Sequence, residues 1–301
     1  MPVHEGAQWI GQTLQSLASE PSGGLQIIVL DSSPTGATEA MVRQFSEQLP
    51  ITFSRRPDIL PWQSKTNLGV AQATADYVCI LHQDDLWLPG RVSAVRRWIA
   101  ASPEAILHLA PSRFIDRNGR QTGMWTCPLP AEKPLDGEAL LERLLVQNFV
   151  SVPAPVFSRE AWTACGGMDD SLWYTADWDI WAKLVKAGPV IYHDEATTAF
   201  RVHGNSLTVT GSRDPADFAA QMNIVLERHL PALPQTRRVR VERAARASIQ
   251  INVLLAGGGL ANLSRAMLKL VSLGPAGARR YLRDSRIAER SISRVRAGLA
   301  G

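Results

Sequence analysis

The sequence predicts an α/β protein in which a mostly parallel sheet is flanked by helices and followed by a helical C-terminal appendage. Short apolar runs that suit buried strands alternate with segments of helical periodicity through the first half of the chain. From residue 214 onward the pattern is helical throughout. The chain has 301 residues, 45% of them hydrophobic, so it is long enough to bury a sizeable core and too apolar to be disordered. We therefore predict two regions, residues 1–210 and 211–301.

The first half of the chain contains three predicted helices, each followed by a predicted strand. The run Leu25–Leu30 is apolar except for one residue, which is typical of a strand buried on both faces in a parallel sheet. The Pro and Gly residues of segment 21–24 end the helix before it. The predicted helices cover residues 7–19, from after Pro34 to about Glu47, and 64–74, and the predicted strands cover residues 25–30, 51–53 and 77–81.

The second half of the chain first mixes strands and helices and then becomes helical. Pro153 and Pro155 have no backbone N–H to donate, so the strand at 150–157 is expected at an edge of the sheet or to be irregular. After residue 214, helices are separated by Pro- and Gly-rich breaks. Strands are predicted at residues 106–109, 113–115 and 150–157, helices at 137–147 and 178–187, and breaks at 231–234, 257–259 and 274–275.

The formal net charge of +4 conceals an uneven distribution of charge along the chain. Residues 237–301 carry 14 Lys and Arg against three acidic residues, or +11, whereas residues 1–236 carry 18 against 25, or −7. A basic tail of this kind predicts an anionic partner, either nucleic acid or a membrane surface. A set of solvated amphipathic helices is the alternative.

The sequence indicates a cytoplasmic protein. No apolar run approaches the ~18 residues of a membrane-spanning helix. The first ten residues lack the basic and apolar parts of a secretory signal. The cysteines at positions 79, 127 and 165 form no CxxC pair, which argues against a disulfide framework or structural zinc and fits a reducing cytosol.

Two adjacent carboxylates follow the predicted strand at 77–81. Asp84 and Asp85 come directly after apolar residues, which places negative charge at the edge of the core. Oxygen ligands of this kind suit Mg²⁺ or Mn²⁺, which share their coordination with substrate phosphates. Because a helix follows, an N-cap role is the alternative.

Five blocks occur in order along the chain: Pro2–Gly6, Ile27–Ser33, Asp76–Pro89, Gly166–Trp181 and Arg201–Ser206. Together they resemble the family 2 glycosyltransferases of the GT-A fold over roughly residues 1–210. The resemblance implies a metal-dependent, inverting transfer of a sugar from a nucleotide-sugar donor to an acceptor hydroxyl. The metal is expected to be Mn²⁺ or Mg²⁺, because it neutralises the charge of the departing diphosphate.

The resemblance also implies roles for individual residues. Asp177, which lies at the start of a helix, is expected to be the general base, with a helix N-cap as the alternative, and Asp179 is the weaker candidate. His203 is expected either at the metal or the diphosphate, or as a structural neighbour of Arg201. The resemblance implies that the donor-binding residues are Pro2, His4, Asp31, Lys65, Asn67, His82 and Asp84. It implies Asp84, Asp85 and His203 as metal ligands and Trp173 and Tyr174 as acceptor residues, whereas Trp178 and Trp181 are expected in the core.

Three positions depart from the family pattern. Ser32 follows Asp31 where a second acid is usual, His82 replaces an acid, and Thr66 stands at an Arg position with Lys65 beside it. Because the matching positions contact the base and ribose in the family, the nucleotide stays open between UDP, GDP and dTDP.

A fourth departure concerns the first strand. Pro2 is preceded by Met1 alone, so the central apolar strand that leads into this block in the family is missing. Such a loss removes core packing and leaves neighbouring backbone groups unpaired. We therefore expect that the natural start lies upstream or that the chain is trimmed, which the intact mass of the native product would test.

The sequence thus predicts an enzyme that adds single sugars to a glycan, lipid-linked or small-molecule acceptor, because it has no Gln-x-x-Arg-Trp motif and no membrane span. The acidic body excludes nucleic acid, and the basic tail is expected at anionic lipid on the inner face of the membrane or at another subunit. The alternative is a degenerate, non-catalytic binding or scaffold module. A nucleotidyltransferase is disfavoured because no glycine-rich phosphate loop occurs near residue 10.

Overall fold

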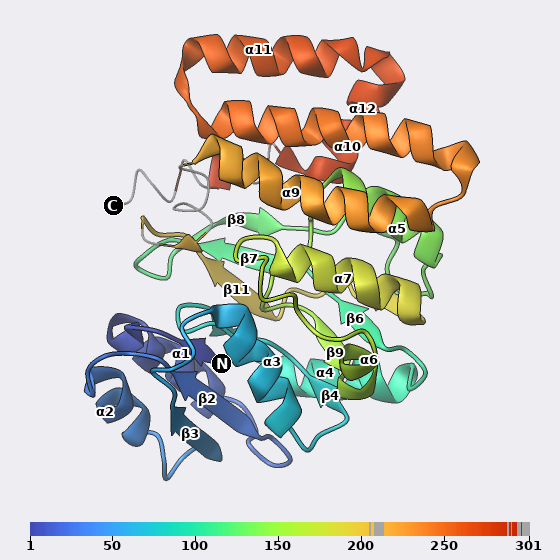
Figure 1. The fold of residues 1–301 in the computed structure, drawn as a ribbon. Coiled ribbons are helices and arrows are strands. Elements are labelled where there is room, and N and C mark those ends of the chain that lie inside the picture. Colours follow the sequence, from blue (N-terminus) through green and yellow to red (C-terminus); the bar gives the residue numbers. More distant parts are fainter. Residues whose placement is uncertain (205, 208–213, 288, 290, 294–295, 297–301) are drawn as a thin grey trace.

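The computed structural model describes residues 1–204, 206–207, 214–287, 289, 291–293 and 296 (Figure 1). Three small sheets occupy one side of the molecule, and long helices cover the other (Figure 1). The predicted boundary near residue 211 lies outside the described residues. No helix within the described ranges is both long enough and apolar enough to cross a membrane.

The N-terminal sheet is parallel, with the order β1-β2-β3. Its strands are β1 (Pro2–Val3), β2 (Ile27–Asp31) and β3 (Ile51–Arg55), with α1 (Ile10–Ala18), α2 (Ala37–Arg43) and α3 (Trp62–Gln72) between and after them. Every residue of β2 is buried, as the continuous apolar run predicts. Asp31 therefore lies at the carboxyl end of a buried strand, next to Val3 of β1.

The other two sheets have four strands each. The second has the order β10-β6-β9-β4, from Val190–Tyr192, Leu107–Leu109, Val156–Ser158 and Tyr77–Val78. The third has the order β5-β11-β7-β8, from Leu86–Trp87, Thr198–Arg201, Ser112–Ile115 and Gln121–Trp125. Parallel pairs join β1 to β2, β2 to β3, β10 to β6 and β11 to β7, while the other four pairs are antiparallel. The α/β class is confirmed, and the pairing is mixed.

The remaining α-helices are α4 (Arg91–Ala101), α5 (Gly137–Val146), α6 (Arg159–Ala164), α7 (Ala176–Ala187), α9 (Pro215–His229), α10 (Gln235–Ala256), α11 (Gly259–Ser272) and α12 (Gly274–Ser285). Side chains cap three of them. Asp136 accepts from the Ala139 N–H at the start of α5, Ser158 Oγ accepts from the Ala161 N–H at the start of α6, and Asp214 accepts from two N–H groups of α9. Pro215 occupies the first turn of α9, where no N–H is needed.

Two predicted strands are shorter than expected. Strand β9 begins only at Val156, because Pro153 and Pro155 lie in the segment before it and have no N–H for a ladder. Strand β4 covers only Tyr77–Val78 of the predicted 77–81. Strand β8 was not predicted, because residues 121–125 contain no continuous apolar run.

The first strand, β1, contains only two residues, Pro2 and Val3. The Met1 amino group donates to the Ile28 carbonyl at 2.7 Å, and burial lowers the pKa of that amine to about 5. A cavity of about 160 Å³ lies beside it between β2, α3 and β4, with Val70 and Ile80 in its lining.

The largest hydrophobic cluster extends across both predicted regions. Side chains of β6, β9, α5 and α7 form it together with Phe218, Met222, Leu226 and Val241 of α9 and α10. Figure 1 shows α9 and α10 lying over α5 and α7. Helices α11 and α12 contribute instead to a separate small cluster with α5 and α10. The packing thus divides the C-terminal helices into an inner pair and an outer pair.

A buried histidine pair in the second sheet predicts sensitivity to acid. His108 Nδ1 lies 3.0 Å from His193 Nε2, while His193 Nδ1 lies 3.0 Å from a Glu132 oxygen and its ring stacks on Trp98. Burial, assisted by His193, lowers the pKa of His108 to about 4. The unfolded chain therefore binds more protons than the native protein between pH 6.5 and 4, so stability decreases as the pH falls through that range.

We expect His108 to cost about 2 kcal/mol of stability at pH 5 relative to pH 7. His108→Gln should remove that part of the pH dependence, measured by urea denaturation at both pH values. The exposed His4, changed to Gln, is the matched control and should leave the difference intact. An unchanged difference in His108→Gln would show that other groups cause the acid sensitivity.

Candidate active site

The loop after β4 carries three side chains that converge. Ligand atoms of His82, Asp84 and Asp85 all lie within 4.8 Å of one another. The chain leaves β4 and enters β5 (Leu86–Trp87) through this loop, which brings the carboxylates to the carboxyl end of the strand as predicted. The structure therefore places three of the predicted site residues in one cluster.

Asp85 is the buried member of this cluster, with 1% of its surface exposed. Its Oδ1 accepts from the Arg201 backbone N–H at 3.0 Å, but its buried Oδ2 has no hydrogen-bond partner. Burial, followed by the charge of Asp84, raises the pKa of Asp85 well above its usual range. An unpartnered buried carboxylate oxygen is costly unless a cation or ligand uses it.

Asp84 faces His203 at the surface of the cluster. Its Oδ2 lies 2.8 Å from His203 Nε2, so the structure brings His203 to the carboxylates as the resemblance implies. The Nε2 atom of His82 is buried and has no partner, and burial lowers the pKa of His82 to about 4, which keeps its ring neutral. A neutral imidazole with a free nitrogen is a competent metal ligand.

Arg201 organises this loop and was not among the predicted site residues. Its Nε donates to the Asp84 carbonyl at 2.7 Å, and its Nη2 donates to Gln12 Oε1 at 2.9 Å. Its guanidinium lies 4.8 Å from the ring centroid of Trp9, which also stacks on His203. Only 1% of Arg201 is exposed. Through its contacts with the Asp84 carbonyl and with Asp85 Oδ1, Arg201 fixes the Asp84–Asp85 loop from its buried side. The sequence feature that could have revealed this role is the position of Arg201 two residues before His203.

These residues fit a divalent cation. The donor set consists of two carboxylates and the imidazole nitrogen of His82, which suits Mn²⁺ and, through the carboxylates, Mg²⁺. The unpartnered Oδ2 of Asp85 and Nε2 of His82 are available for coordination.

A second group of predicted residues surrounds the end of β2. Asp31 is fully buried; its Oδ1 accepts from the N–H and the hydroxyl of Ser33, and its Oδ2 has no partner. Lys65 donates to the Val3 carbonyl at 2.7 Å and to Ser32 Oγ at 2.6 Å. Burial lowers the pKa of Lys65 to about 8, although Asp31 opposes the shift. Lys65 therefore ties β1, which includes Pro2, to the end of β2.

His4 connects this group to the carboxylate loop. Its ring Nδ1 lies 3.1 Å from Ser32 Oγ, and its backbone N–H donates to Gln83 Oε1 at 2.8 Å. Gln83 in turn donates to the His4 carbonyl at 3.0 Å. The ends of β1, β2 and β4 therefore meet at one place.

Asn67 contacts a different part of the chain. Its amide donates to the Met168 carbonyl at 2.8 Å and accepts from the Met168 N–H at 2.9 Å. Gly167, beside it, has φ +66°, and a Cβ there would come within 2.6 Å of the Asn67 amide oxygen. Asn67 thus holds the glycine turn of the acceptor-side loop, and its predicted contact with the nucleotide stays a prediction.

Asp177 lies in the first turn of α7, and its Oδ2 accepts from Asn148 Nδ2 at 2.9 Å. No sequence signal pointed to Asn148, because the two residues come from separate elements. Trp173 and Tyr174 pack against each other in the preceding loop with ring centroids 5.7 Å apart. The structure therefore places the predicted base and the predicted acceptor residues in one segment.

Trp62 links the acceptor-side segment to the carboxylate loop. Its indole N–H donates to the Trp173 carbonyl at 2.9 Å, and its ring packs edge-on against His82 with centroids 5.1 Å apart. Trp62 of α3 therefore contacts both the acceptor-side segment at Trp173 and the carboxylate loop at His82.

Asp179, the weaker candidate for the base, is structural. It is fully buried between Lys183, Arg228 and His229. Burial alone would raise the pKa of Asp179, but hydrogen bonds from His229 and Lys183 hold it well below its usual range. Trp178 and Trp181 belong to the large core cluster, as expected.

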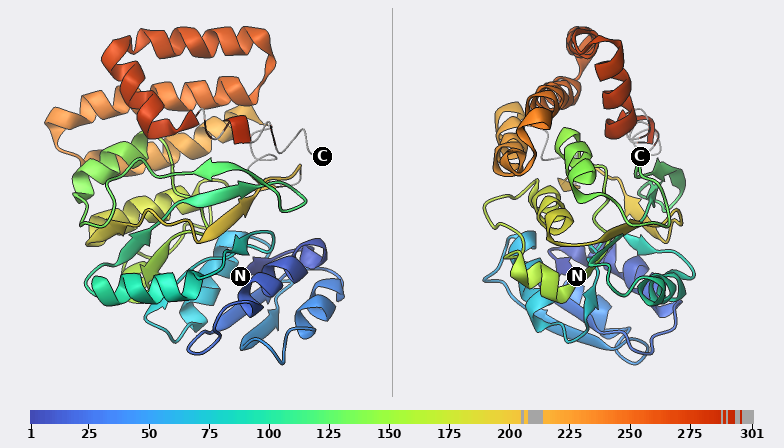
Figure 2. Two further views of the ribbon diagram at one scale, coloured as in Figure 1. Left: turned by 180° about the vertical axis from the view of Figure 1, so that it is seen from behind. Right: turned by 90° about the vertical axis from the view of Figure 1, so that its right-hand side faces the viewer.

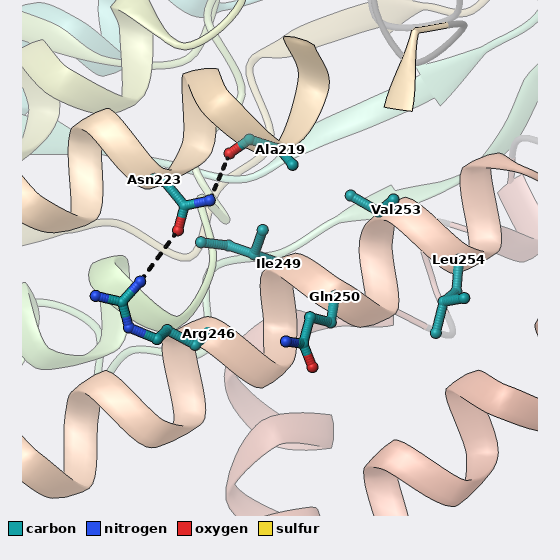
Figure 3. A pocket seen from close by; sticks show the side chains of 7 residues that line it. All are labelled: Ala219, Asn223, Arg246, Ile249, Gln250, Val253 and Leu254. Carbon is teal, nitrogen blue, oxygen red and sulfur yellow. Dashed lines mark hydrogen bonds between the residues drawn. The ribbon is translucent and has the colours of Figure 1, made fainter. Parts of the chain in front are cut away.

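A cavity of about 480 Å³ between α9 and α10 contains none of the predicted site residues (Figure 3). Its lining is mostly apolar, with Arg246 and Asn223 joined by a hydrogen bond of 3.4 Å near one end (Figure 3). This cavity lies in the helical region and plays no part in the site described above.

Comparisons with known proteins identify the chain. A family model described as Glycosyl transferase family 2 matches residues 1–153, just over half of the sequence. The chain belongs to glycosyltransferase family 2. It is similar to an uncharacterized glycosyltransferase of Haemophilus influenzae, with 23% identity over 89% of this chain and 86% of the relative. An uncharacterized glycosyltransferase of Rickettsia typhi is 21% identical over 73% of this chain and 68% of the relative.

Solved structures resemble this family 2 glycosyltransferase in fold. TarS 1–349 of S. aureus, in complex with UDP-GlcNAc, aligns with a TM-score of 0.59 and 15% identity over 96% of this chain and 89% of that 1–349 chain. A mannosyltransferase from Pyrobaculum calidifontis, in complex with GDP-Man and Mn²⁺, aligns with a TM-score of 0.55 and 16% identity over 98% of this chain and 86% of that protein. The predicted GT-A fold and the assignment as a glycosyltransferase are confirmed.

Proposed function

We propose that this glycosyltransferase performs a metal-dependent, inverting transfer of one sugar from a nucleotide-sugar donor to an acceptor hydroxyl. The observation that carries the proposal is the cluster of His82, Asp84 and Asp85, in which a buried carboxylate oxygen has no partner. The structural neighbours with bound UDP-GlcNAc, or with GDP-Man and Mn²⁺, support both a nucleotide-sugar donor and a divalent metal.

In this proposal the donor lies across the ends of β1, β2 and β4. The free Oδ2 of Asp31 accepts a hydrogen bond from the nucleoside, and Lys65, Pro2 and His4 shape the same edge. Asp84 and Asp85, with His203 or His82 beside them, would hold the divalent cation. A bound Mn²⁺ or Mg²⁺ neutralises the negative charge that develops as the diphosphate departs.

Asp177 accepts the proton of the acceptor hydroxyl as the new glycosidic bond forms. The acceptor oxygen attacks the anomeric carbon on the face opposite the phosphate, so that the bond to the diphosphate breaks and the configuration inverts. Asn148 orients the carboxylate of Asp177 by donating to one of its oxygens. Trp173 and Tyr174 offer aromatic surfaces to a glycan, lipid-linked or small-molecule acceptor. Transfer within the cytoplasm is supported by the three free cysteines.

Removing the Asp84 carboxylate tests the metal site. A screen of UDP, GDP and dTDP with and without Mn²⁺ should find a nucleotide that raises the thermal midpoint of the wild-type protein only when the metal is present. A nucleotide concentration of about a hundred times its Kd stabilises the folded protein by about 2.7 kcal/mol. Asp84→Asn should lose this stabilisation, because the cation then loses one of its two carboxylates.

Asp76→Asn is the matched control, because Asp76 is exposed and lies at the other end of β4. It should respond to metal and nucleotide as the wild-type protein does. A nucleotide shift that persists in the presence of EDTA would contradict metal-dependent binding of the donor.

A further inference from the structure

The outermost helix of the molecule carries an exposed apolar face. Helix α11 (Gly259–Ser272) lies at the edge of the protein farthest from the β1-β2-β3 sheet (Figures 1 and 2). Eleven large apolar side chains are exposed in the described residues, and five of them belong to this one helix: Leu260, Leu263, Met267, Leu268 and Val271. Isolated exposed apolar residues are ordinary, but a cluster on one element marks an interaction surface.

The spacing of these residues places them side by side. Positions 260, 263, 267 and 271 follow the i, i+3, i+7, i+11 pattern of a single helical stripe, with Leu268 beside it. Leu260 is 83% exposed and Val271 is 69% exposed, so the stripe extends over nearly the whole helix. The side of α11 that faces α10 includes Ala266 and Leu270, which belong to the small cluster with Ile251 of α10.

The segment that contains the stripe is basic. Residues 257–283 contain five Lys and Arg and no acidic residue. The nearest acid along the chain, Asp284, is buried and paired with Arg143. Among the described residues, the only acid within ion-pair distance of the basic side chains of this segment, apart from Asp284, is Glu142, 4.0 Å from Arg280.

We propose that α11 docks on an anionic lipid surface, with its apolar stripe inserted at the headgroup level and the Lys and Arg side chains of residues 257–283 drawn to the phosphates. A basic amphipathic helix with an apolar face of this kind suits the membrane interface. At 14 residues, α11 is shorter than the ~20 residues of a spanning helix, so it lies on the surface. The proposal does not depend on the sugar, the nucleotide or the metal of the transfer reaction.

A second copy of the chain is the competing occupant, and two observations disfavour it. A helix of this length is about 21 Å long and about 10 Å wide, which gives a footprint of about 200 Å². A stable pair buries about 800 Å² on each partner. In a two-fold dimer each stripe would also contact the same stripe of the partner. The two basic segments 257–283 would then lie close together and repel each other.

Co-sedimentation of the full chain with vesicles tests the proposal. We expect the protein to sediment with phosphatidylcholine vesicles that contain about one third phosphatidylglycerol, and at least about tenfold less with phosphatidylcholine alone. Leu263→Gln, Met267→Gln and Val271→Asn together should reduce binding to the anionic vesicles by about tenfold or more. Arg265→Gln with Lys269→Gln should weaken the same binding.

The matched control replaces three exposed apolar residues elsewhere: Leu60→Gln, Ile224→Gln and Val239→Asn. It should bind as the wild-type protein does. Wild-type protein that stays in the supernatant with both kinds of vesicle overturns the proposal. So does a wild-type dimer in light scattering that the α11 triple variant dissociates, because the stripe then belongs to an interface between copies.

Discussion

Asp177→Asn is expected to lower the turnover of the nucleotide-sugar donor by about 10²- to 10⁴-fold, the usual contribution of a general base. The amide cannot take the proton of the incoming hydroxyl, whereas its size and its contact with Asn148 are nearly preserved. Because Asp177 is not part of the His82, Asp84 and Asp85 cluster, the thermal shift caused by metal and nucleotide should stay at the wild-type value. Loss of turnover with retention of donor binding separates this variant from Asp84→Asn.

Glu160→Gln is the matched control for this experiment. Glu160 is an exposed acid in the first turn of α6, so its replacement removes a carboxylate from an equivalent helical position away from the site. Its donor hydrolysis, measured as release of nucleoside diphosphate, should equal that of the wild-type protein. Wild-type turnover by Asp177→Asn would refute the assignment of the base.

Truncation after residue 210 is expected to prevent folding of the remaining chain. Helices α9 and α10 supply eight large apolar side chains, counting the short connection between the helices, to the principal core: Phe218, Met222, Val225, Leu226, Leu230, Leu233, Val241 and Ile249. At about 1.5–3 kcal/mol for each buried side chain, their loss equals or exceeds the total stability of about 5–15 kcal/mol of an ordinary domain. Circular dichroism and solubility after expression measure the outcome.

Truncation after residue 257 should behave differently. It removes α11 and α12, whose buried members Ala266 and Tyr281 belong to a separate small cluster. The shortened chain should therefore fold cooperatively with a lowered thermal midpoint, since it also loses the Arg143–Asp284 ion pair. A folded, soluble fragment 1–210 would instead support residues 211–301 as an independent region.

Much of the fold was predictable because its signals are local. The apolar run before Asp31, the break at residues 21–24 and the helical period of the C-terminal third lie within short windows, and most of the predicted helices appear within a few residues of their expected ends. Strand lengths were predicted less well. The chain after Val78 is as apolar as a strand, yet its ladder with β9 ends there, because β9 itself is shortened by two prolines.

The predicted site residues were mostly found together, but their supporting residues were not foreseen. The pairing of Asp84 with His203 joins residues 119 positions apart, and Asn148 reaches Asp177 from a different element. Trp62 gave no signal, because its role depends on two contacts with distant segments.

The sequence by itself determined that carboxylates follow a buried strand, that a basic helical tail follows an acidic body, and that the motifs are those of family 2 glycosyltransferases. Tertiary structure alone decided that Arg201 holds the Asp84–Asp85 loop, that half of the strand pairs are antiparallel, and that α9 and α10 complete the main core. The physical reason is the separation along the chain of the residues that decide each feature. Helical periodicity and apolar runs depend on neighbouring residues, whereas burial of Asp85 and exposure of the α11 stripe depend on which distant elements pack against them.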